Sequence, residues 1–409
     1  MTSVGSLSKL GLRSLARNLK LCSTSTYSTR RPELNFDFLL DESNTDMIRL
    51  NIQSRKGVGD IDGLLKKWKE MEELINTKDK PKITELELRK MWDEIYDLAS
   101  DIPNMSIEDV PVGDETNAKI LCEWGEKRTG NLLTAEKLVQ GWRALIHPVD
   151  ACGERSYVFL GALANLERAL LKSTFERLTA LGFKPVTVPD LVSLDITEAC
   201  GVLSRKSNKN IQYTLKDEPN VALSGTAEMG IASLLKNQIL DASHLPLRLV
   251  SMSRCFRPEI SHSASEAKLY RVHEFNKVEM FTICTPEQSE SEMEYLVQIQ
   301  KGIFESLGLH CRQLLMPSEE LGAPAARKID IEAWMPGRQR YGEVSSASNC
   351  KDFQARRLGI KYRTSDGKTD FVHTFNGTGI ASTRAVVSIL ETFQTVYMSC
   401  GFNINSLLC

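Results

Sequence analysis

The chain has 409 residues, of which 42% are apolar and 25% charged, a composition typical of a folded protein with one large domain and a smaller one. Its formal net charge of −2 excludes polyanion binding through overall positive charge, so any nucleic acid would need a local basic patch. The ten cysteines form no Cys-x-x-Cys pair and the six histidines have no ligand spacing. A structural zinc site is therefore not expected, and scattered thiols fit a reducing compartment.

Residues 1–32 differ from the rest because they contain basic residues, many Ser and Thr, and no acid. Lys9, Arg13, Arg17 and Lys20 are spaced by four, four and three residues, which places them on one helical face. No apolar run is long enough for a secretory core or a membrane span. We predict a mitochondrial presequence over 1–32 and a mitochondrial matrix location; a disordered basic tail is the alternative.

Two helices are expected next. Apolar residues follow a helical stripe over 61–75, a break follows at 79–81, and Thr84 and Glu87 form a capping box before a second stripe over 88–98. We predict an antiparallel hairpin of two helices of ~16 residues, each about 24 Å long. The alternative is a small subdomain whose stripe is buried in the body. A Pro- and Gly-containing linker over 101–114 separates an arm domain (33–105) from a second domain (106–409).

The second domain alternates helical and extended patterns. Helices are predicted over 163–181, 227–238, 287–307 and 384–394, and strands over 184–188, 247–256, 269–281, 329–334, 341–345 and 371–374. Strands that follow one another directly or across long helices favour an α+β fold, in which helices pack on an antiparallel sheet.

The segment 247–281 is the best candidate for a functional site. Its two apolar runs flank a Ser-rich segment without helical period, which predicts an antiparallel hairpin. Alternation along the strands groups polar residues on one face of each, namely Arg271, His273, Phe275, Lys277 and Glu279, and Arg257 and Glu259. Arginine forks suit phosphates, a ring suits a base, and carboxylates suit an ammonium or a metal. A solvated sheet face with ordinary salt bridges is the alternative.

A series of motifs runs in order along residues 102–394. They are Asp109-Val-Pro-Val-Gly-Asp114, Thr226-Ala-Glu228, Phe256-Arg-Pro-Glu259, Leu269-Tyr-Arg-Val-His273, Lys277-Val-Glu-Met280, Lys328-Ile-Asp-Ile-Glu-Ala-Trp-Met-Pro-Gly337, Ser346-Ala-Ser-Asn-Cys350, Asp352-Phe-Gln-Ala-Arg356, Asn376-Gly-Thr-Gly379 and Arg384. With these residues the segment resembles the seryl-tRNA synthetases, particularly the mitochondrial branch. The resemblance implies a class II domain on a six- or seven-stranded antiparallel sheet behind a short helical hairpin arm, with dimerisation near Pro189.

The resemblance also implies roles for individual residues. Arg257 and Arg384 would hold ATP phosphates, Phe275 would stack on adenine, and Glu259 and Glu343 would serve ATP and Mg²⁺, with Glu343 as metal ligand. Arg257, Glu259 and Arg384 are thereby the implied catalytic residues. The serine would be surrounded by Thr226, Glu228, Glu279, Asn376 and Thr378. The implied partners are a mitochondrial serine tRNA and a second subunit, either a copy of the chain or the mitochondrial seryl-tRNA synthetase.

Four departures from the family pattern stand beside this resemblance. Ala267-Lys268-Leu269 replaces Arg-Gly-Leu, Pro258 replaces a small residue, the arm is short, and the tail 395–409 lacks a Pro-containing ending. They favour a paralogue of the kind known in insects, with reduced or lost aminoacylation, that binds tRNA or associates with the mitochondrial synthetase. An active serine–tRNA ligase is the main alternative, and a regulator without nucleotide is a third.

Single residues also have simpler interpretations. Arg271 and Lys277 would be solvated strand charges, and His273 a hydrogen-bonded structural residue. Glu343 could pair with Arg338 or Arg340. Asn376-Gly-Thr-Gly379, taken alone, would be a turn.

Overall fold

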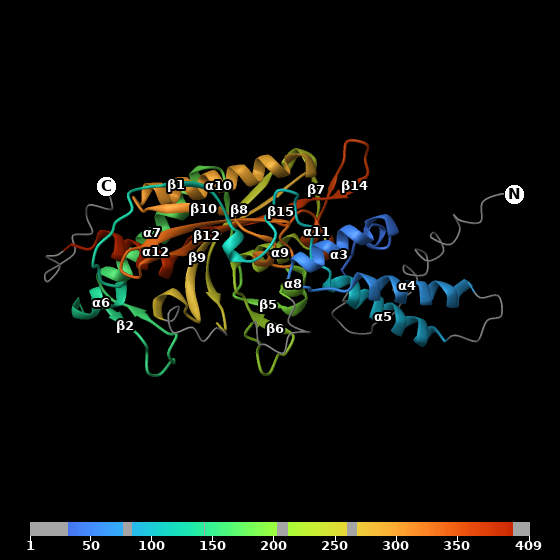
Figure 1. The fold of residues 1–409 in the computed structure, drawn as a ribbon, viewed down its shortest axis with the longest axis horizontal. Helices are drawn as coiled ribbons and strands as arrows, with labels where there is room; N and C mark the ends of the chain where they lie inside the picture. The colour runs from blue at the N-terminus through green and yellow to red at the C-terminus, as the bar shows by residue number, and fades with distance from the viewer. Residues whose placement is uncertain (1–31, 77–83, 143, 203–211, 260–267, 396–409) are drawn as a thin grey trace.

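The computed structural model describes residues 32–76, 84–142, 144–202, 212–259 and 268–395. The predicted presequence, the break at 79–81, Ala267 and the tail beyond 395 lie outside these residues. A body built around a large sheet carries a pair of helices that projects from one end (Figure 1).

The central sheet has eight strands in the order β1-β10-β11-β12-β15-β9-β8-β4. All neighbours are antiparallel except β4 and β8, which are parallel. The strands are β1 Lys119–Trp124, β10 Cys311–Leu315, β11 Arg327–Met335, β12 Arg340–Asn349, β15 His373–Ala381, β9 Glu274–Cys284, β8 Leu247–Phe256 and β4 Lys184–Pro185. The predicted α+β fold with an antiparallel sheet is confirmed, with eight strands where six or seven were expected.

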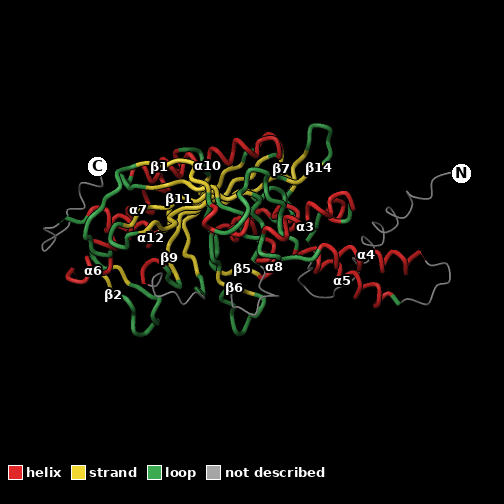
Figure 2. Tube along the Cα trace, viewed as in Figure 1, coloured by secondary structure: helices red, strands yellow, loops and turns green. Residues whose placement is uncertain are grey.

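Helices cover both faces of this sheet (Figures 1 and 2). The larger core packs α7 (Ala162–Ala180), α10 (Ser289–Ser306) and α12 (Ser382–Phe393) against one face. A second core packs α8 (Leu194–Ala199), α9 (Ala227–Leu235) and α11 (Phe353–Leu358) against part of the other face. The rest of that second face is left for polar side chains, and this is where the site lies.

Strand β9 shows how the alternation of side chains places the site. Val278 and Met280 point into the larger core, while Phe281 and Ile283 pack with α9 in the second core. Phe275, Lys277 and Glu279 share the face of Phe281 and Ile283 because successive side chains alternate. The polar half of this face therefore lies directly beside the apolar half that α9 covers.

Shorter elements complete the fold. Small sheets are formed by β14 (Thr369–Phe371), β13 (Lys361–Arg363) and β7 (Ile239–Asp241), by β2 (Leu145–Ile146) and β3 (Val158–Phe159), and by β5 (Leu191–Ser193) and β6 (Val221–Leu223). The remaining helices are α2 (Phe36–Leu39), α3 (Thr45–Ser54) and α6 (Ala135–Val139), with 3-10 turns at η1 Glu42–Asn44, η2 Glu115–Asn117, η3 Gln140–Trp142, η4 Ala242–His244, η5 Lys268–Tyr270, η6 Pro286–Gln288 and η7 Ser318–Glu320.

The arm consists of α4 (Ile61–Asn76) and α5 (Glu85–Asp101), which lie side by side (Figure 1). Thr84 caps α5, and its capping box with Glu87 forms as predicted. The apolar stripes meet α2 and α3 in a core of their own that includes Ile48, Leu64 and Ile95. The predicted hairpin is confirmed, and its stripe is buried within the arm rather than in the body. No helix in the described ranges is long and apolar enough to cross a membrane.

Three sequence predictions need correction. The strand expected at 269–281 begins only at Glu274, because 268–270 form a 3-10 turn. The strand expected at 184–188 is limited to Lys184–Pro185. Asn376-Gly-Thr-Gly379 is no turn but the middle of β15, and a Cβ at Gly379 would lie 3.2 Å from Leu178, Thr174 and the Val278 carbonyl oxygen, closer than most Cβ contacts.

Candidate active site

An open cavity of about 430 Å³ lies between the β8–β9 hairpin, η5, β12, β15 and the start of α12. Six of the residues predicted for the site line it, namely Arg257, Glu259, Phe275, Glu343, Thr378 and Arg384. They come from segments up to 127 residues apart in sequence (384 − 257 = 127). The fold therefore brings together the five side chains that the resemblance assigned to the nucleotide, with Thr378 from the serine group beside them.

The ion pair of Arg384 and Glu343 forms one wall of the cavity. Arg384 Nη1 lies 3.3 Å from Glu343 Oε2 and donates to the Glu343 carbonyl oxygen at 3.0 Å, and the guanidinium lies 4.6 Å from the Tyr270 ring centre. Burial alone would raise the pKa of Glu343, but the charges of Arg384, Lys328 and Arg257 lower it to about 2. Glu343 is thus a fixed anion beside a fixed cation.

The suggestion that Glu343 pairs with Arg338 or Arg340 is therefore wrong. Arg338 lies 2.5 Å from Glu136 and 3.2 Å from Glu391, and Arg340 lies 5.5 Å from the Tyr270 ring centre. Arg338, just before β12, and Arg340 and Glu343, on β12, contact different neighbours, so sequence proximity was a poor guide to the partner of Glu343.

A second part of the cavity wall holds Arg257, Phe275 and Glu259. The Arg257 guanidinium lies 5.4 Å from the centre of the Phe275 ring. Glu259 has a φ of +48°, which a residue with a side chain rarely adopts, and its carboxylate accepts a 3.2 Å hydrogen bond from Arg271. Strained backbone of this kind often occurs at functional sites because the surrounding structure must hold it in place.

Two neighbours of this wall, His273 and Arg271, were given simpler interpretations from sequence. His273 is hydrogen-bonded as predicted, because its Nδ1 lies 2.9 Å from the Tyr213 hydroxyl and 3.2 Å from the Arg257 carbonyl oxygen. Arg271 is not a freely solvated strand charge, since it pairs with Glu259 and its side chain is 31% exposed. Arg271 thereby fixes the carboxylate of Glu259 at the cavity.

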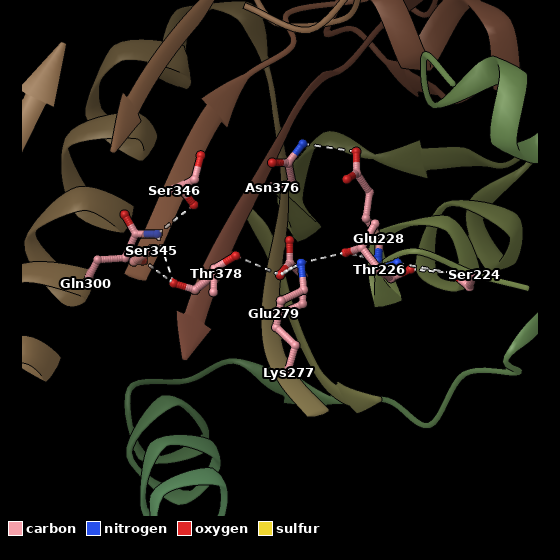
Figure 3. Close-up of polar contacts among 10 residues, drawn as sticks. All are labelled: Ser224, Thr226, Glu228, Lys277, Glu279, Gln300, Ser345, Ser346, Asn376 and Thr378. Atoms are coloured by element: carbon pink, nitrogen blue, oxygen red, sulfur yellow. Dashed lines mark hydrogen bonds and ion pairs between the residues drawn. The ribbon is translucent and has the colours of Figure 1, made fainter. Parts of the chain in front are cut away.

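The remaining predicted residues form, together with Thr378, a second and deeper group, so named because Glu228 and Glu279 are buried (Figure 3). Thr378 donates to Glu279 at 3.3 Å, and Lys277 Nζ lies 2.5 Å from the same carboxylate and donates to Thr226 Oγ1 at 2.9 Å. Asn376 Nδ2 donates to Glu228 at 3.0 Å. Lys277 was expected to be solvated; instead its side chain is 6% exposed, because α9 covers this part of the sheet.

Gln354, which sequence reasoning did not single out, completes the deeper group. It lies on α11, is fully buried, donates to Glu228 at 2.5 Å and accepts from the Thr374 hydroxyl at 2.7 Å. It stands inside the motif Asp352-Phe-Gln-Ala-Arg356, and a lone polar residue on an otherwise apolar helix face was the available signal.

The pKa of Glu228 is raised to about 7, first by burial and then by the nearby charge of Glu279. The folded state therefore holds the proton of Glu228 more tightly than the unfolded state, in which the pKa is 4.5. This stabilises the fold at pH values below 4.5, and the stabilisation is lost as the pH rises to about 7. Glu228→Gln keeps an oxygen that can accept from Asn376 and Gln354 but cannot ionise. We expect it to gain up to about 3 kcal/mol relative to wild type between pH 4.5 and 8, measured by denaturant unfolding. A pH-independent difference would contradict the assignment.

The donor set also suits Mg²⁺ held mainly by phosphates. Glu343 and Glu259 are the carboxylates on the cavity, and no group of three or more His, Cys, Asp or Glu in the described residues could hold a metal alone. Mg²⁺ commonly takes one or two carboxylates together with substrate phosphates and waters. The residues present therefore fit a metal that arrives with a nucleotide, with Glu343 as the ionised ligand.

Comparison with known proteins gives a consistent result. Residues 213–393 match the family model described as tRNA synthetase class II core domain (G, H, P, S and T). The chain is 42% identical over 325 residues to the mitochondrial serine–tRNA ligase of Bos taurus, covering 77% of this chain and 61% of that protein. It is 38% identical over 321 residues to the serine–tRNA ligase of Dictyoglomus turgidum, covering 75% and 74%.

Solved structures agree in fold. Seryl-tRNA synthetase of Pyrococcus horikoshii, complexed with ATP, superposes with a TM-score of 0.76 and 29% identity, covering 88% of this chain and 94% of that one. The cytoplasmic serine–tRNA ligase of Naegleria fowleri, in complex with AMP, gives a TM-score of 0.78 and 26% identity over 90% and 95%. The aligned part of the chain spans 61% of the length of the bovine mitochondrial relative.

Proposed function

The chain belongs to the serine–tRNA ligase family of class II tRNA synthetases, and we propose that it activates serine with ATP and transfers it to a mitochondrial serine tRNA. The observation that carries this proposal is the joint arrangement of the two side-chain groups. A cavity with two guanidinium groups, an aromatic ring and an ionised carboxylate adjoins a buried group of carboxylates and hydroxyls, which Lys277 and Thr378 connect to it. The first group suits a nucleotide and the second a small hydroxylated amino acid.

The chemistry needs positioned charge more than a nucleophile. The serine carboxylate attacks the α-phosphorus of ATP, pyrophosphate leaves, and negative charge builds on the phosphate oxygens. Arg257 and Arg384 both line the cavity, where their guanidinium groups are available to bind these oxygens. Phe275 offers its ring to adenine. Mg²⁺ bound to Glu343 would neutralise part of the phosphate charge.

The deeper group would orient the amino acid. Glu279 and Glu228 are the carboxylates available to an ammonium, and Thr226, Thr378 and Asn376 supply hydroxyl and amide partners. Positioning of this kind lowers the entropic part of the barrier. A small pocket already filled with hydrogen-bonded polar groups also disfavours larger apolar side chains, because these would leave buried polar groups without partners.

We assign tRNA binding to the helical arm and mitochondrial targeting to the basic N-terminal segment. The arm has its own core and projects from the body, as a surface for an elongated partner would. Bovine and murine relatives are mitochondrial ligases, which supports a mitochondrial location. The second subunit of a dimer is either a copy of this chain or the mitochondrial seryl-tRNA synthetase.

Serine-dependent ATP–pyrophosphate exchange tests the proposal. The purified chain is expected to catalyse exchange with serine, and to give at most about a hundredth of that rate with alanine, which lacks the hydroxyl. Charging of a mitochondrial serine tRNA transcript should accompany exchange and fall steeply with added salt. Absence of exchange together with salt-dependent tRNA binding would replace the proposal by the second candidate.

That second candidate is a paralogue with reduced or lost aminoacylation, and Pro258 and Ala267-Lys268 favour it. Proline cannot donate a backbone hydrogen bond between Arg257 and Glu259, and the loop has lost an arginine and a glycine. The double variant Ala267→Arg, Lys268→Gly separates the two functions. If the chain is an active ligase, the exchange rate of this variant should differ from that of the wild type by less than about threefold. If the loop disables the chain, the wild type should show no exchange and the variant should show measurable exchange.

A further inference from the structure

Lys277 forms the inner end of the cavity. It lines the cavity together with Thr378, and both side chains contact the Glu279 carboxylate, which does not line the cavity itself. The Lys277 ammonium stands between that carboxylate, at 2.5 Å, and the hydroxyl of Thr226, at 2.9 Å (Figure 3). The Lys277 and Glu279 side chains are 6% and 3% exposed. The ion pair is therefore shielded from solvent at the point where the nucleotide cavity meets the deeper pocket.

A buried lysine at this position is energetically unfavourable by itself. Burying an ammonium costs several kcal/mol, which a buried carboxylate only partly offsets, and an apolar side chain of similar size would fill the space as well. The nearest anionic neighbours explain the choice in part. Glu228 lies on α9 and Glu279 on β9. Burial and the negative charge of Glu279 raise the pKa of Glu228, whereas the positive charge of Lys277 lowers it. Lys277 thus supplies positive charge to a pocket that holds two carboxylates.

An amino acid substrate brings the same charge to the same place. Its ammonium needs a carboxylate, and Glu279, one of the two carboxylates assigned to the ammonium, is already paired with Lys277. We propose that Lys277 is an internal counter-ion that occupies the place of the substrate ammonium beside Glu279 and thereby limits how strongly the pocket binds an amino group. This inference rests on the proposed function, because it takes serine as the ligand of the deeper pocket.

The test compares two ligands that differ only in the amino group, L-serine and 3-hydroxypropanoate, in binding to the full chain by calorimetry. In Lys277→Met the substrate ammonium becomes the close partner of Glu279, while the ligand without an amino group leaves that carboxylate buried alone. The affinity for serine relative to 3-hydroxypropanoate should rise about tenfold. Lys277→Gln, also neutral, should change the ratio in the same direction, and Lys277→Arg should keep the wild-type ratio.

Equal weakening of both ligands in the two neutral variants would overturn the proposal, because Lys277 would then only hold the Thr226 segment on the sheet. Failure of every variant to bind serine would overturn it as well. If Lys277→Met does not fold, the Gln and Arg variants carry the comparison. Pyrophosphate exchange reports separately on the proposed function: a chain that binds serine without exchange contradicts catalysis, while the ligand ratio still decides the role of Lys277.

Discussion

Replacing Arg384 with alanine is expected to lower serine-dependent ATP–pyrophosphate exchange by a factor of about 10² to 10³, which is the usual effect of removing one fixed group that stabilises transition-state charge. The guanidinium is held by Glu343 and Tyr270, and its side chain is 14% exposed, so it is already placed before the nucleotide binds. Its loss also leaves the Glu343 carboxylate without a close cation. The loss should appear in both kcat and the KM for ATP, with the KM for serine changed least.

Arg340→Ala is the matched control for this prediction. Arg340 also stands near the Tyr270 ring, at 5.5 Å, but does not line the cavity. Exchange by this variant should stay within about threefold of wild type. Similar losses in the two variants would mean that the ring environment matters and that Arg384 has no special role. Thermal unfolding of both variants would show whether a loss of activity merely reflects a loss of fold.

The sequence predicted those parts of the fold that local patterns determine. The arm helix α4 and the cap of α5 at Thr84 agree with the prediction because stripes and capping boxes are properties of neighbouring residues. Strands β1 and β10 were not predicted. Strand β1 is a mostly exposed edge strand without a clear alternation, and its pairing with β10 joins residues almost 200 positions apart. Such pairing depends on tertiary contacts that no short window contains.

The site was predicted in part for the same reason. Alternation correctly put Phe275, Lys277 and Glu279 on one face, but it could not tell which helix covers that face. Lys277 was therefore expected in solvent, although α9 brings Thr226 to within 2.9 Å of its ammonium. Gln354 was missed because its contact with Glu228 links α11 to α9 across 126 residues. The sequence and the resemblance predicted which residues belong to the site, whereas only the fold showed which side chains contact one another.

Among the contacts that join the arm to the body is one buried cation, Arg55, which is 4% exposed at the end of α3. Its Nη1 donates to the carbonyl oxygens of Asn104 and Ala325 at 2.5 and 2.9 Å, and its Nη2 to those of Gly322 and Leu321 at 2.5 and 3.4 Å. Burial lowers the pKa of Arg55 to about 10, so the group remains charged at neutral pH. One cation thus fastens α3 to the segment that precedes β11.

Arg55→Met should separate the two half-reactions. Four carbonyl groups, two of them in fully buried hydrogen bonds, lose a charged donor, so we expect about 3 kcal/mol less stability and a loosened arm, measured by denaturant unfolding. Exchange should stay within about threefold because the cavity lies elsewhere, whereas tRNA charging should fall about 10- to 100-fold, since a misplaced arm misaligns the bound tRNA. Lys56→Ala, which breaks only the exposed 3.3 Å pair with Glu320, is the control and should change neither reaction. Equal losses in exchange and charging by Arg55→Met would instead mean that this joint supports the catalytic body itself.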